Sequence, residues 1–261
     1  MIRDMEGQVA IVTGGSDGLG PATARLLARR GATVVICARR ADRLESARAE
    51  LAALGKAEAH QLDVSDEAAV TALIEDVAAR HGRLDMLVNN AMSVHYAPLR
   101  KLTLEHWRKD FAVNADAVFV STKAAMKVMA AQELAGRQRG AIVNIASTCG
   151  IRAAPNMASY SASKAAMVHF TAAAAMEGAP LGIRVNAIVP GQVNTPSTAD
   201  FAARAPEVAA RTAEAIPMGR GGEPDELAEA IVFMLSSAAS YITGTALPVD
   251  GGKAVQLYMP G

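Results

Sequence analysis

The chain has few of the residues that would point to a disulfide scaffold, a metal site or a highly charged partner. It contains two cysteines, Cys37 and Cys149, which are far apart, and its five histidines show no metal-ligand spacing. Lys plus Arg and Asp plus Glu each number 26, so the formal net charge is zero. We therefore expect no disulfide framework, no metal, and no nucleic-acid or membrane partner, and the cysteine usage favours a reducing compartment.

We expect neither a signal peptide nor a membrane-spanning segment. The first six residues are charged and lack the apolar core of a signal peptide. Residues 230–249 carry no charge over a membrane-spanning length, but serines, Gly244 and Pro248 interrupt them. This stretch predicts a helix end, a turn and a buried strand, and the whole chain is predicted to be cytoplasmic.

What the chain does contain is an alternation of apolar runs with helical stretches. Its 261 residues, 51% of them apolar, suit one large α/β domain. Continuous apolar runs are typical of strands that a parallel sheet buries on both faces. We expect strands at 8–12, 33–37, 57–62, 84–88, 141–146, 183–188 and 245–249, and helices at 22–30, 42–54, 66–81, 102–134, 159–177, 207–215 and 224–235. Because no Pro/Gly-rich linker separates the early elements, the sequence predicts a single-domain, Rossmann-type doubly wound parallel sheet flanked by helices on both faces.

A glycine-rich turn follows the first strand and precedes the first helix. Glycines at 14, 18 and 20 permit a tight turn and let backbone N–H groups approach a pyrophosphate at the helix N-terminus. A strand before such a turn and a helix after it are the context of a dinucleotide site. The expected cofactor contacts here are Gly14, Ser16, Asp17, Gly18, Leu19 and Gly20.

The end of the second strand indicates which dinucleotide binds. An NAD enzyme usually has an acidic residue about 20 positions past the glycines, for the ribose 2′-hydroxyl. This chain has Ala38 there, followed by Arg39 and Arg40, whose guanidinium groups suit a phosphate. We therefore expect NADP(H) rather than NAD(H). The other interpretation is that the two arginines only begin the next helix, and Asp17 adds no positive charge.

Tyr160 and Lys164 have the spacing of an acid/base pair. In a helix, residues at i and i+4 lie on one face, so the ammonium would stand beside the phenol. A nearby cation favours the phenolate, so we expect a lowered pKa that lets Tyr160 exchange protons near neutrality. Ser147 follows the expected strand at 141–146, and the loop after it can bring its hydroxyl beside the phenol. By itself, this spacing also occurs on solvated surface helices.

The chain contains, in order, the glycine turn, Asn89-Asn90-Ala91, Ser147, Tyr160 with Lys164, and Pro190-Gly191. Together these motifs resemble the classical short-chain dehydrogenase/reductase family, from about residue 7 to residue 252. The resemblance implies that Asn114 completes the catalytic set through a water linked to Lys164. It implies cofactor contacts at Asp63, Val64, Asn90, Ala91, Tyr160, Lys164, Pro190, Gly191, Val193 and Thr195, although the segment with Asp63 could also cap a helix through Ser65 or Asp66. The family usually has Gly at the position of Met92. By the same analogy we expect a homotetramer. Within each chain, residues 7–95 would mainly bind the dinucleotide, and residues 140–252 would carry the catalytic residues, the nicotinamide loop and a substrate lid.

The resemblance implies hydride transfer between NADP(H) and a secondary alcohol or ketone. Most candidate substrate contacts are apolar or neutral, which favours a small to medium, largely apolar compound; they are Met92, His95, Cys149, Arg152, Asn194, Phe201 and Met218. Arg152 would instead suit a carboxylate or phosphate. Two alternatives stay open: a 3-oxoacyl-thioester (acyl carrier protein) reductase, and a non-catalytic NADP-binding regulator or scaffold. The apolar tail at 253–261 is expected to dock on a neighbouring subunit.

Overall fold

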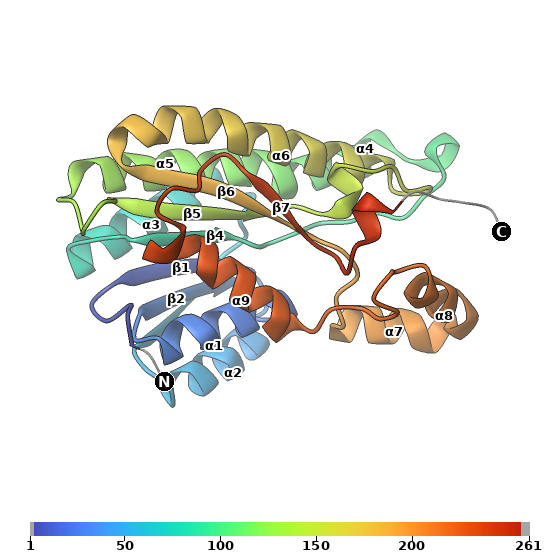
Figure 1. Ribbon diagram of the computed structural model, residues 1–261, viewed down its shortest axis with the longest axis horizontal. Helices are drawn as coiled ribbons and strands as arrows, with labels where there is room; N and C mark the ends of the chain where they lie inside the picture. Colours follow the sequence, from blue (N-terminus) through green and yellow to red (C-terminus); the bar gives the residue numbers. More distant parts are fainter. Residues whose placement is uncertain (1–2, 257–261) are drawn as a thin grey trace.

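Apolar segments along the chain form one parallel sheet, as their pattern predicts. The computed structural model describes residues 3–256. Its seven strands have the order β3-β2-β1-β4-β5-β6-β7, and every neighbouring pair is parallel (Figure 1). The strands are β1 Val9–Thr13, β2 Thr33–Ala38, β3 Ala57–Gln61, β4 Met86–Asn89, β5 Gly140–Ile145, β6 Ile183–Pro190 and β7 Ala246–Val249. This is the predicted Rossmann-type doubly wound fold, and the predicted strand positions are confirmed to within one or two residues at most ends.

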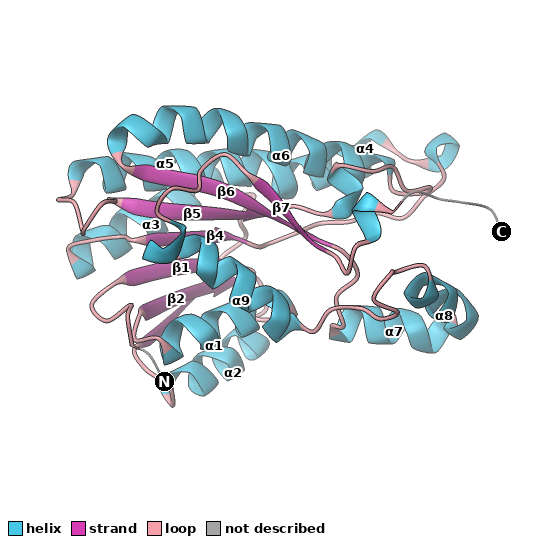
Figure 2. Ribbon diagram, in the orientation of Figure 1, coloured by secondary structure: helices cyan, strands magenta, loops and turns pink. Residues whose placement is uncertain are grey.

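Helices cover both faces of the sheet (Figure 2). One face carries α1 Leu19–Arg29, α2 Ala41–Ala52 and α9 Pro224–Leu235, and the other carries α3 Glu67–His81, α5 Ala117–Ala131 and α6 Ala158–Gly178. Alternate residues of a strand point to opposite faces, so Ala10 and Val12 join one apolar cluster while Val9 and Ile11 join the other. The uninterrupted apolar strands are explained by this burial on both sides.

The predicted helix over 102–134 is three consecutive helical segments. These are α4 Leu104–Phe111, a π-helical turn Ala112–Asp116, and α5. Asn114 lies inside the π-turn, is fully buried, and bonds through its side chain to Ser93 and Ser163. A π-turn is a local break in the regular α-helical ladder that often occurs at functional sites. The periodicity of the sequence does not reveal it.

Two helices form a projection between β6 and α9. They are α7 Pro196–Arg204 and α8 Pro206–Glu214, and neither contains a buried residue. Only the second of them was predicted from the sequence. Thr195 and Thr198 form a capping box at the start of α7, which explains why a helix begins there. In Figure 1 the two helices stand apart from the sheet, at the lower right.

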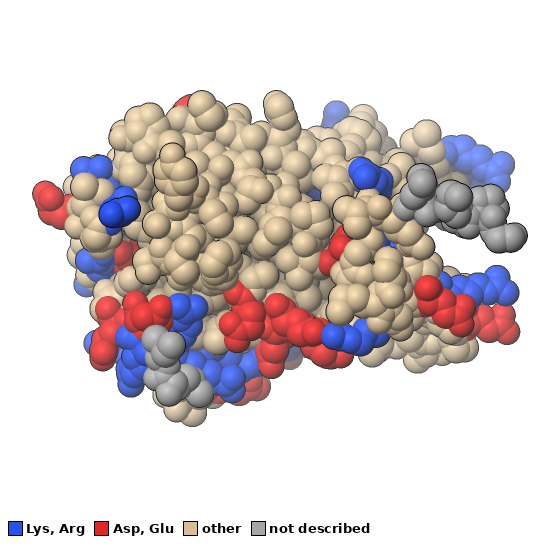
Figure 3. All heavy atoms as spheres, in the orientation of Figure 1, with Lys and Arg blue, Asp and Glu red and all other residues tan. Residues whose placement is uncertain are grey.

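Residues 230–249 form the end of α9, a turn and β7, as predicted. Between residues 3 and 256, no helix is long and apolar enough to cross a bilayer. The short 3-10 helices are Leu99–Lys101, Thr148–Gly150, Ala179–Leu181, Ser237–Ala239 and Lys253–Val255. Most of the apolar tail, residues 257–261, lies outside the described residues. Figure 3 shows charged side chains gathered over α1, α2 and the start of α9, whereas the surface over α6 and β7 is largely uncharged.

Candidate active site

The glycine turn forms a cradle in which there is no space for side chains. A Cβ on Gly20 would lie 2.3 Å from the Gly14 carbonyl oxygen and 2.7 Å from Asn90 Nδ2. Asn90 Nδ2 donates to the carbonyl oxygens of Thr13 (2.9 Å) and Gly14 (3.1 Å), which ties the turn to the end of β4. The first turn of α1 has no side-chain cap, so its N–H groups are available to a ligand. This geometry fits a pyrophosphate of a dinucleotide.

Three arginines lie around the glycine turn, and two of them are paired with it. Asp17 accepts from Arg40 Nη2 at 2.9 Å and from Arg43 Nη1 at 2.7 Å. Arg39 is 72% exposed and reaches Asp63 only at 3.8 Å. The sequence reasoning missed Arg43; the signal was a basic residue one helical turn after Arg40. Asp17 therefore not only adds no positive charge, but also pairs with Arg40 and Arg43, two of the arginines that could bind a phosphate.

The loops at the carboxyl ends of β3 and β6 complete the cradle. Asp63 accepts from the Ser65 backbone and hydroxyl at 3.0 and 2.8 Å. Asp66 caps α3 by accepting from the Ala69 N–H, as the capping interpretation expected. A Cβ on Gly18 would lie 3.4 Å from the Thr195 methyl carbon, so the loop after β6 lies directly against the glycine turn. The carboxyl ends of strands that are far apart in the sequence therefore lie together at one edge of the sheet.

Ser147, Tyr160 and Lys164 are brought together at this edge. All three are buried, and Lys164 Nζ lies 5.8 Å from the centre of the Tyr160 ring. Lys164 Nζ donates to the Ile145 carbonyl oxygen at 2.6 Å. The Ser147 hydroxyl accepts from the Cys149 N–H at 3.1 Å, and its influence lowers the pKa of the Tyr160 phenol. A Cβ on Gly150 would lie 2.9 Å from the Lys164 backbone, so the turn after β5 packs closely against α6.

The expected lowering of the Tyr160 pKa is wrong for this structure. Burial raises the pKa of Tyr160 to about 12, and the influence of the Ser147 hydroxyl offsets only part of that effect. Burial also lowers the pKa of Lys164 to about 7. Both shifts have one cause, because a site with little water disfavours the charged form of each group. The helical spacing of the pair shows their proximity but not this loss of solvation.

Asn114 joins the loop after β4 to α6. Its Oδ1 accepts from the Ser93 N–H at 3.0 Å, and its Nδ2 donates to the Ser93 carbonyl oxygen at 2.7 Å and to Ser163 Oγ at 3.0 Å. Asp110 belongs to the same network, through Ser93 and Ser159, and was missed in the sequence. A signal was present, since Asp110 stands four residues before Asn114 and shares its helical face.

The candidate substrate residues divide into two groups. Cys149 lies near the reacting phenol, since its thiol helps raise the pKa of Tyr160, and His95 is joined through Asp110 to Ser159, the residue before Tyr160. The others bond elsewhere or face solvent. Asn194 Nδ2 donates to Glu223 at 2.6 Å, Arg152 bonds the Ile151 carbonyl oxygen, and Met92, Phe201 and Met218 are 54%, 49% and 66% exposed.

Comparison with known proteins is consistent with this geometry. A family model described as enoyl-(acyl carrier protein) reductase matches residues 14–254. The cis-4-hydroxycyclohexanecarboxylate dehydrogenase of Sinomonas cyclohexanicum is 44% identical over 94% of this chain and 96% of its own. The 3-oxoacyl-(acyl-carrier-protein) reductase of Thermotoga maritima is 38% identical over 96% of this chain and 99% of its own.

A solved structure has the same fold throughout. It is that of a protein from Beutenbergia cavernae, provisionally assigned as an NAD(P)-dependent gluconate 5-dehydrogenase, with NADP bound at low occupancy. The two chains are 38% identical and superpose with a TM-score of 0.90, covering 98% of this chain and 100% of the other. Almost the whole chain thus has a structural counterpart in a protein that was solved with NADP bound.

Proposed function

Because the chain belongs to the short-chain dehydrogenase/reductase family, we propose that it transfers a hydride between NADP(H) and a secondary alcohol or ketone of small to medium, largely apolar structure. The observation that carries the proposal is the buried group of Ser147, Tyr160 and Lys164 beside a glycine cradle without space for side chains. A protein that only binds a nucleotide has no need of the acid/base pair. A bound nicotinamide supplies or accepts the hydride.

Each residue of the proposed catalytic set has a separate role. Ser147 hydrogen-bonds the substrate oxygen and stabilises the charge that develops on it. Tyr160 is the general acid in reduction: its raised pKa keeps the phenol protonated at neutral pH, so it can donate its proton to that oxygen. Lys164 holds the nicotinamide ribose hydroxyls. Asn114 fixes the loop after β4 against α6, through Ser93 and Ser163, and its π-turn holds the proposed water.

The proposal is tested by following the absorbance of NADPH and of NADH, in parallel, with a panel of carbonyl compounds. The panel contains cyclic and aryl ketones, steroids, sugars and a 3-oxoacyl thioester. Oxidation of NADPH with a cyclic ketone is the expected result. Tight NADPH binding in a titration, without turnover of any carbonyl or alcohol, would contradict the proposal and favour a non-catalytic regulator or scaffold.

The preference for NADP(H) is proposed from the arginines around the glycine turn. Replacing Arg39 by Ala removes a largely exposed guanidinium that can bind the 2′-phosphate, whereas NAD(H) has no such phosphate. We expect the ratio of kcat/KM for NADPH over NADH to fall about tenfold, the effect of one charge-assisted hydrogen bond. Steady-state kinetics with both cofactors measures it.

A matched control and a reverse change sharpen this test. Arg48, on helix α2, which begins just after Arg39, pairs with Glu45 and not with the glycine turn, so Arg48→Ala should leave the ratio unchanged. Asp17→Asn removes the carboxylate that Arg40 and Arg43 contact, so it should raise the ratio. A wild type that prefers NADH would refute the phosphate role of the arginines.

A second candidate function is reduction of a 3-oxoacyl thioester on an acyl carrier protein. The similarity to the Thermotoga maritima reductase favours it. Such a substrate needs a basic surface near the site entrance, for the acidic carrier. Turnover of the thioester in the same panel, with no turnover of simple cyclic ketones, would make it the preferred function.

We further propose that the protein is a homotetramer built through α5, α6 and their neighbours. Phe119 on α5 and Met176 on α6 are 49% and 77% exposed, and the surface over α6 carries little charge (Figure 3). A solution mass of four chains by light scattering is expected, and a monomer at micromolar concentration would contradict it. A cytoplasmic location stays a prediction from the sequence.

A further inference from the structure

Asp110 is a buried carboxylate outside the proposed catalytic set. It lies on α4 and is fully buried. Its oxygens accept four hydrogen bonds: from Ser93 Oγ at 2.8 Å, from the His95 N–H at 3.3 Å, from His95 Nδ1 at 2.7 Å and from Ser159 Oγ at 2.5 Å. A buried carboxylate is costly unless donors satisfy it, and this one is fully satisfied. Burial alone would raise the pKa of Asp110, but these donors hold it below its usual value.

The carboxylate determines which nitrogen of His95 carries the proton. An ionised carboxylate can only accept, so Nδ1 is the donor and Nε2 keeps its lone pair in the neutral ring. The His95 ring also stacks on His106, with centroids 4.5 Å apart. One nitrogen and one ring face are therefore occupied, and 28% of the side chain remains exposed. Nε2 is the polar atom left for a ligand.

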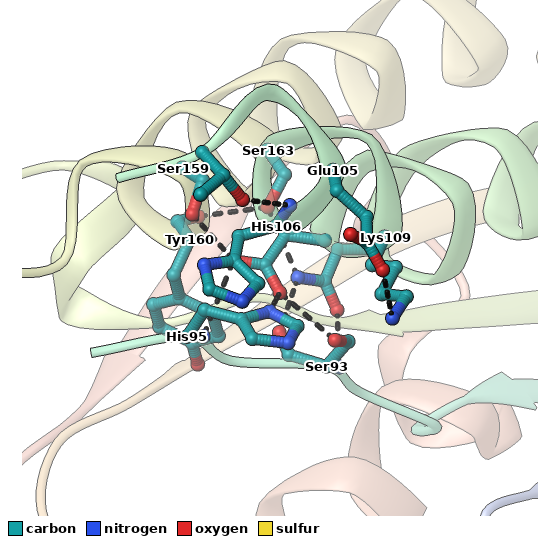
Figure 4. Close-up of polar contacts among 11 residues, drawn as sticks. Ser93, His95, Glu105, His106, Lys109, Ser159, Tyr160 and Ser163 are labelled. Carbon is teal, nitrogen blue, oxygen red and sulfur yellow. Dashed lines mark hydrogen bonds and ion pairs between the residues drawn. The ribbon is translucent and has the colours of Figure 1, made fainter. Parts of the chain in front are cut away.

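His95 is tied to the segment that carries the reacting phenol. Asp110 Oδ2 accepts both from the His95 N–H and from the hydroxyl of Ser159, the residue before Tyr160. The loop that contains His95 also pairs with the residues before α6, where the Ala97 N–H donates to the Asn156 carbonyl oxygen at 2.9 Å. Figure 4 shows His95, Ser159 and Tyr160 in this one polar cluster. His95 is thus fixed, through Asp110, to the start of the helix that carries Tyr160.

We propose that Asp110 is a positioning residue that holds His95 as the acceptor for a second hydroxyl of the substrate, away from the reacting carbinol. The substrate class is then a hydroxylated alicyclic alcohol or ketone, such as a ring diol, rather than an unsubstituted ring. A carboxylate in place of that hydroxyl is disfavoured, because the buried Asp110 carboxylate behind His95 already places negative charge there. This inference rests on the proposed dehydrogenase function.

The test compares cyclohexane-1,4-diol, cyclohexanol and 4-hydroxycyclohexanecarboxylate as substrates of the intact enzyme, by formation of the reduced cofactor. In His95→Phe the ring that stacks on His106 remains but the acceptor is lost. We expect the ratio of kcat/KM for the diol over cyclohexanol to fall about tenfold, the effect of one hydrogen bond. His95→Gln, which restores an acceptor, should recover part of the ratio, and a merely structural role predicts no such recovery.

Further variants separate positioning from folding. Asp110→Asn keeps the shape but loses the charge that selects the tautomer, so it should lower the same ratio; if it does not fold, the two His95 variants still decide the question. His106→Phe retains the stack and should leave the ratio unchanged. An unchanged ratio in His95→Phe, or a larger loss with the carboxylate than with the diol, overturns the inference while the dehydrogenase function stands. A wild type inactive on all alcohols and ketones refutes the proposed function itself.

Discussion

Tyr160→Phe is expected to lower kcat by about three orders of magnitude while cofactor affinity changes little, because proton transfer by a positioned side chain contributes about 10²–10⁴ to rate. The phenol ring is buried and fills its site without the hydroxyl, so the fold should be retained. The Ser147 hydroxyl keeps its bond from the Cys149 N–H at 3.1 Å when the phenol hydroxyl is removed. Stopped-assay turnover and a fluorescence titration of the reduced cofactor measure the two quantities.

Tyr241 provides the matched control for this change. Its side chain is fully exposed and lies after α9, so Tyr241→Phe removes the same atom without touching the site. Its turnover should equal that of the wild type. If Tyr160→Phe keeps more than a tenth of wild-type turnover, Tyr160 is not the proton donor and the acid/base assignment fails.

Lys164→Met is expected to lower turnover about a hundredfold or more and to weaken cofactor binding. The Lys164 side chain is proposed to hold the nicotinamide ribose by donating hydrogen bonds, and a thioether of similar length cannot donate one. Lys127→Met is the control, because that lysine is exposed on α5 and pairs only with Glu75 at the surface. Equal kinetics of Lys164→Met and the wild type would remove Lys164 from the mechanism.

The same variant should be more stable than the wild type at neutral pH. Burial lowers the pKa of Lys164 to about 7 in the folded chain, while an unfolded lysine titrates near about 10.4. Between these values the unfolded chain binds a proton that the folded chain does not, so the wild-type free energy of unfolding rises with pH, by up to about 1.4 kcal/mol per unit.

Urea unfolding at a series of pH values tests the sign of this effect. Methionine has no such titration, so the stability advantage of Lys164→Met should be largest at pH 7 and below, and should shrink as the pH rises toward 10. The cofactor-free protein is used, because ligands that bind the folded state would add their own stabilisation. An advantage that grows with pH would show that the buried amine is not neutral in the folded protein.

Local patterns in the sequence were sufficient for the elements and for the parts of the site that lie within one element. Apolar runs predicted the strands at the centre of the sheet, because burial on both faces requires them to be uninterrupted, whereas the edge strand β3 is only half-buried and carries polar residues. The glycine turn was recognised because close approach of two backbones admits no side chain. Tyr160 and Lys164 were recognised because one helical turn separates them.

The tertiary structure alone decided the properties that depend on contacts between distant segments. The opposite pKa shifts of Tyr160 and Lys164 arise from burial by several elements at once, so helical spacing predicted proximity but the wrong direction for the phenol. The pairing of Asp17 with Arg40 and Arg43, and the enclosure of Asp110 by His95 and Ser159, likewise join separate loops and helices. Periodicity records which face of an element is buried, whereas solvation and charge pairing depend on what packs against that face.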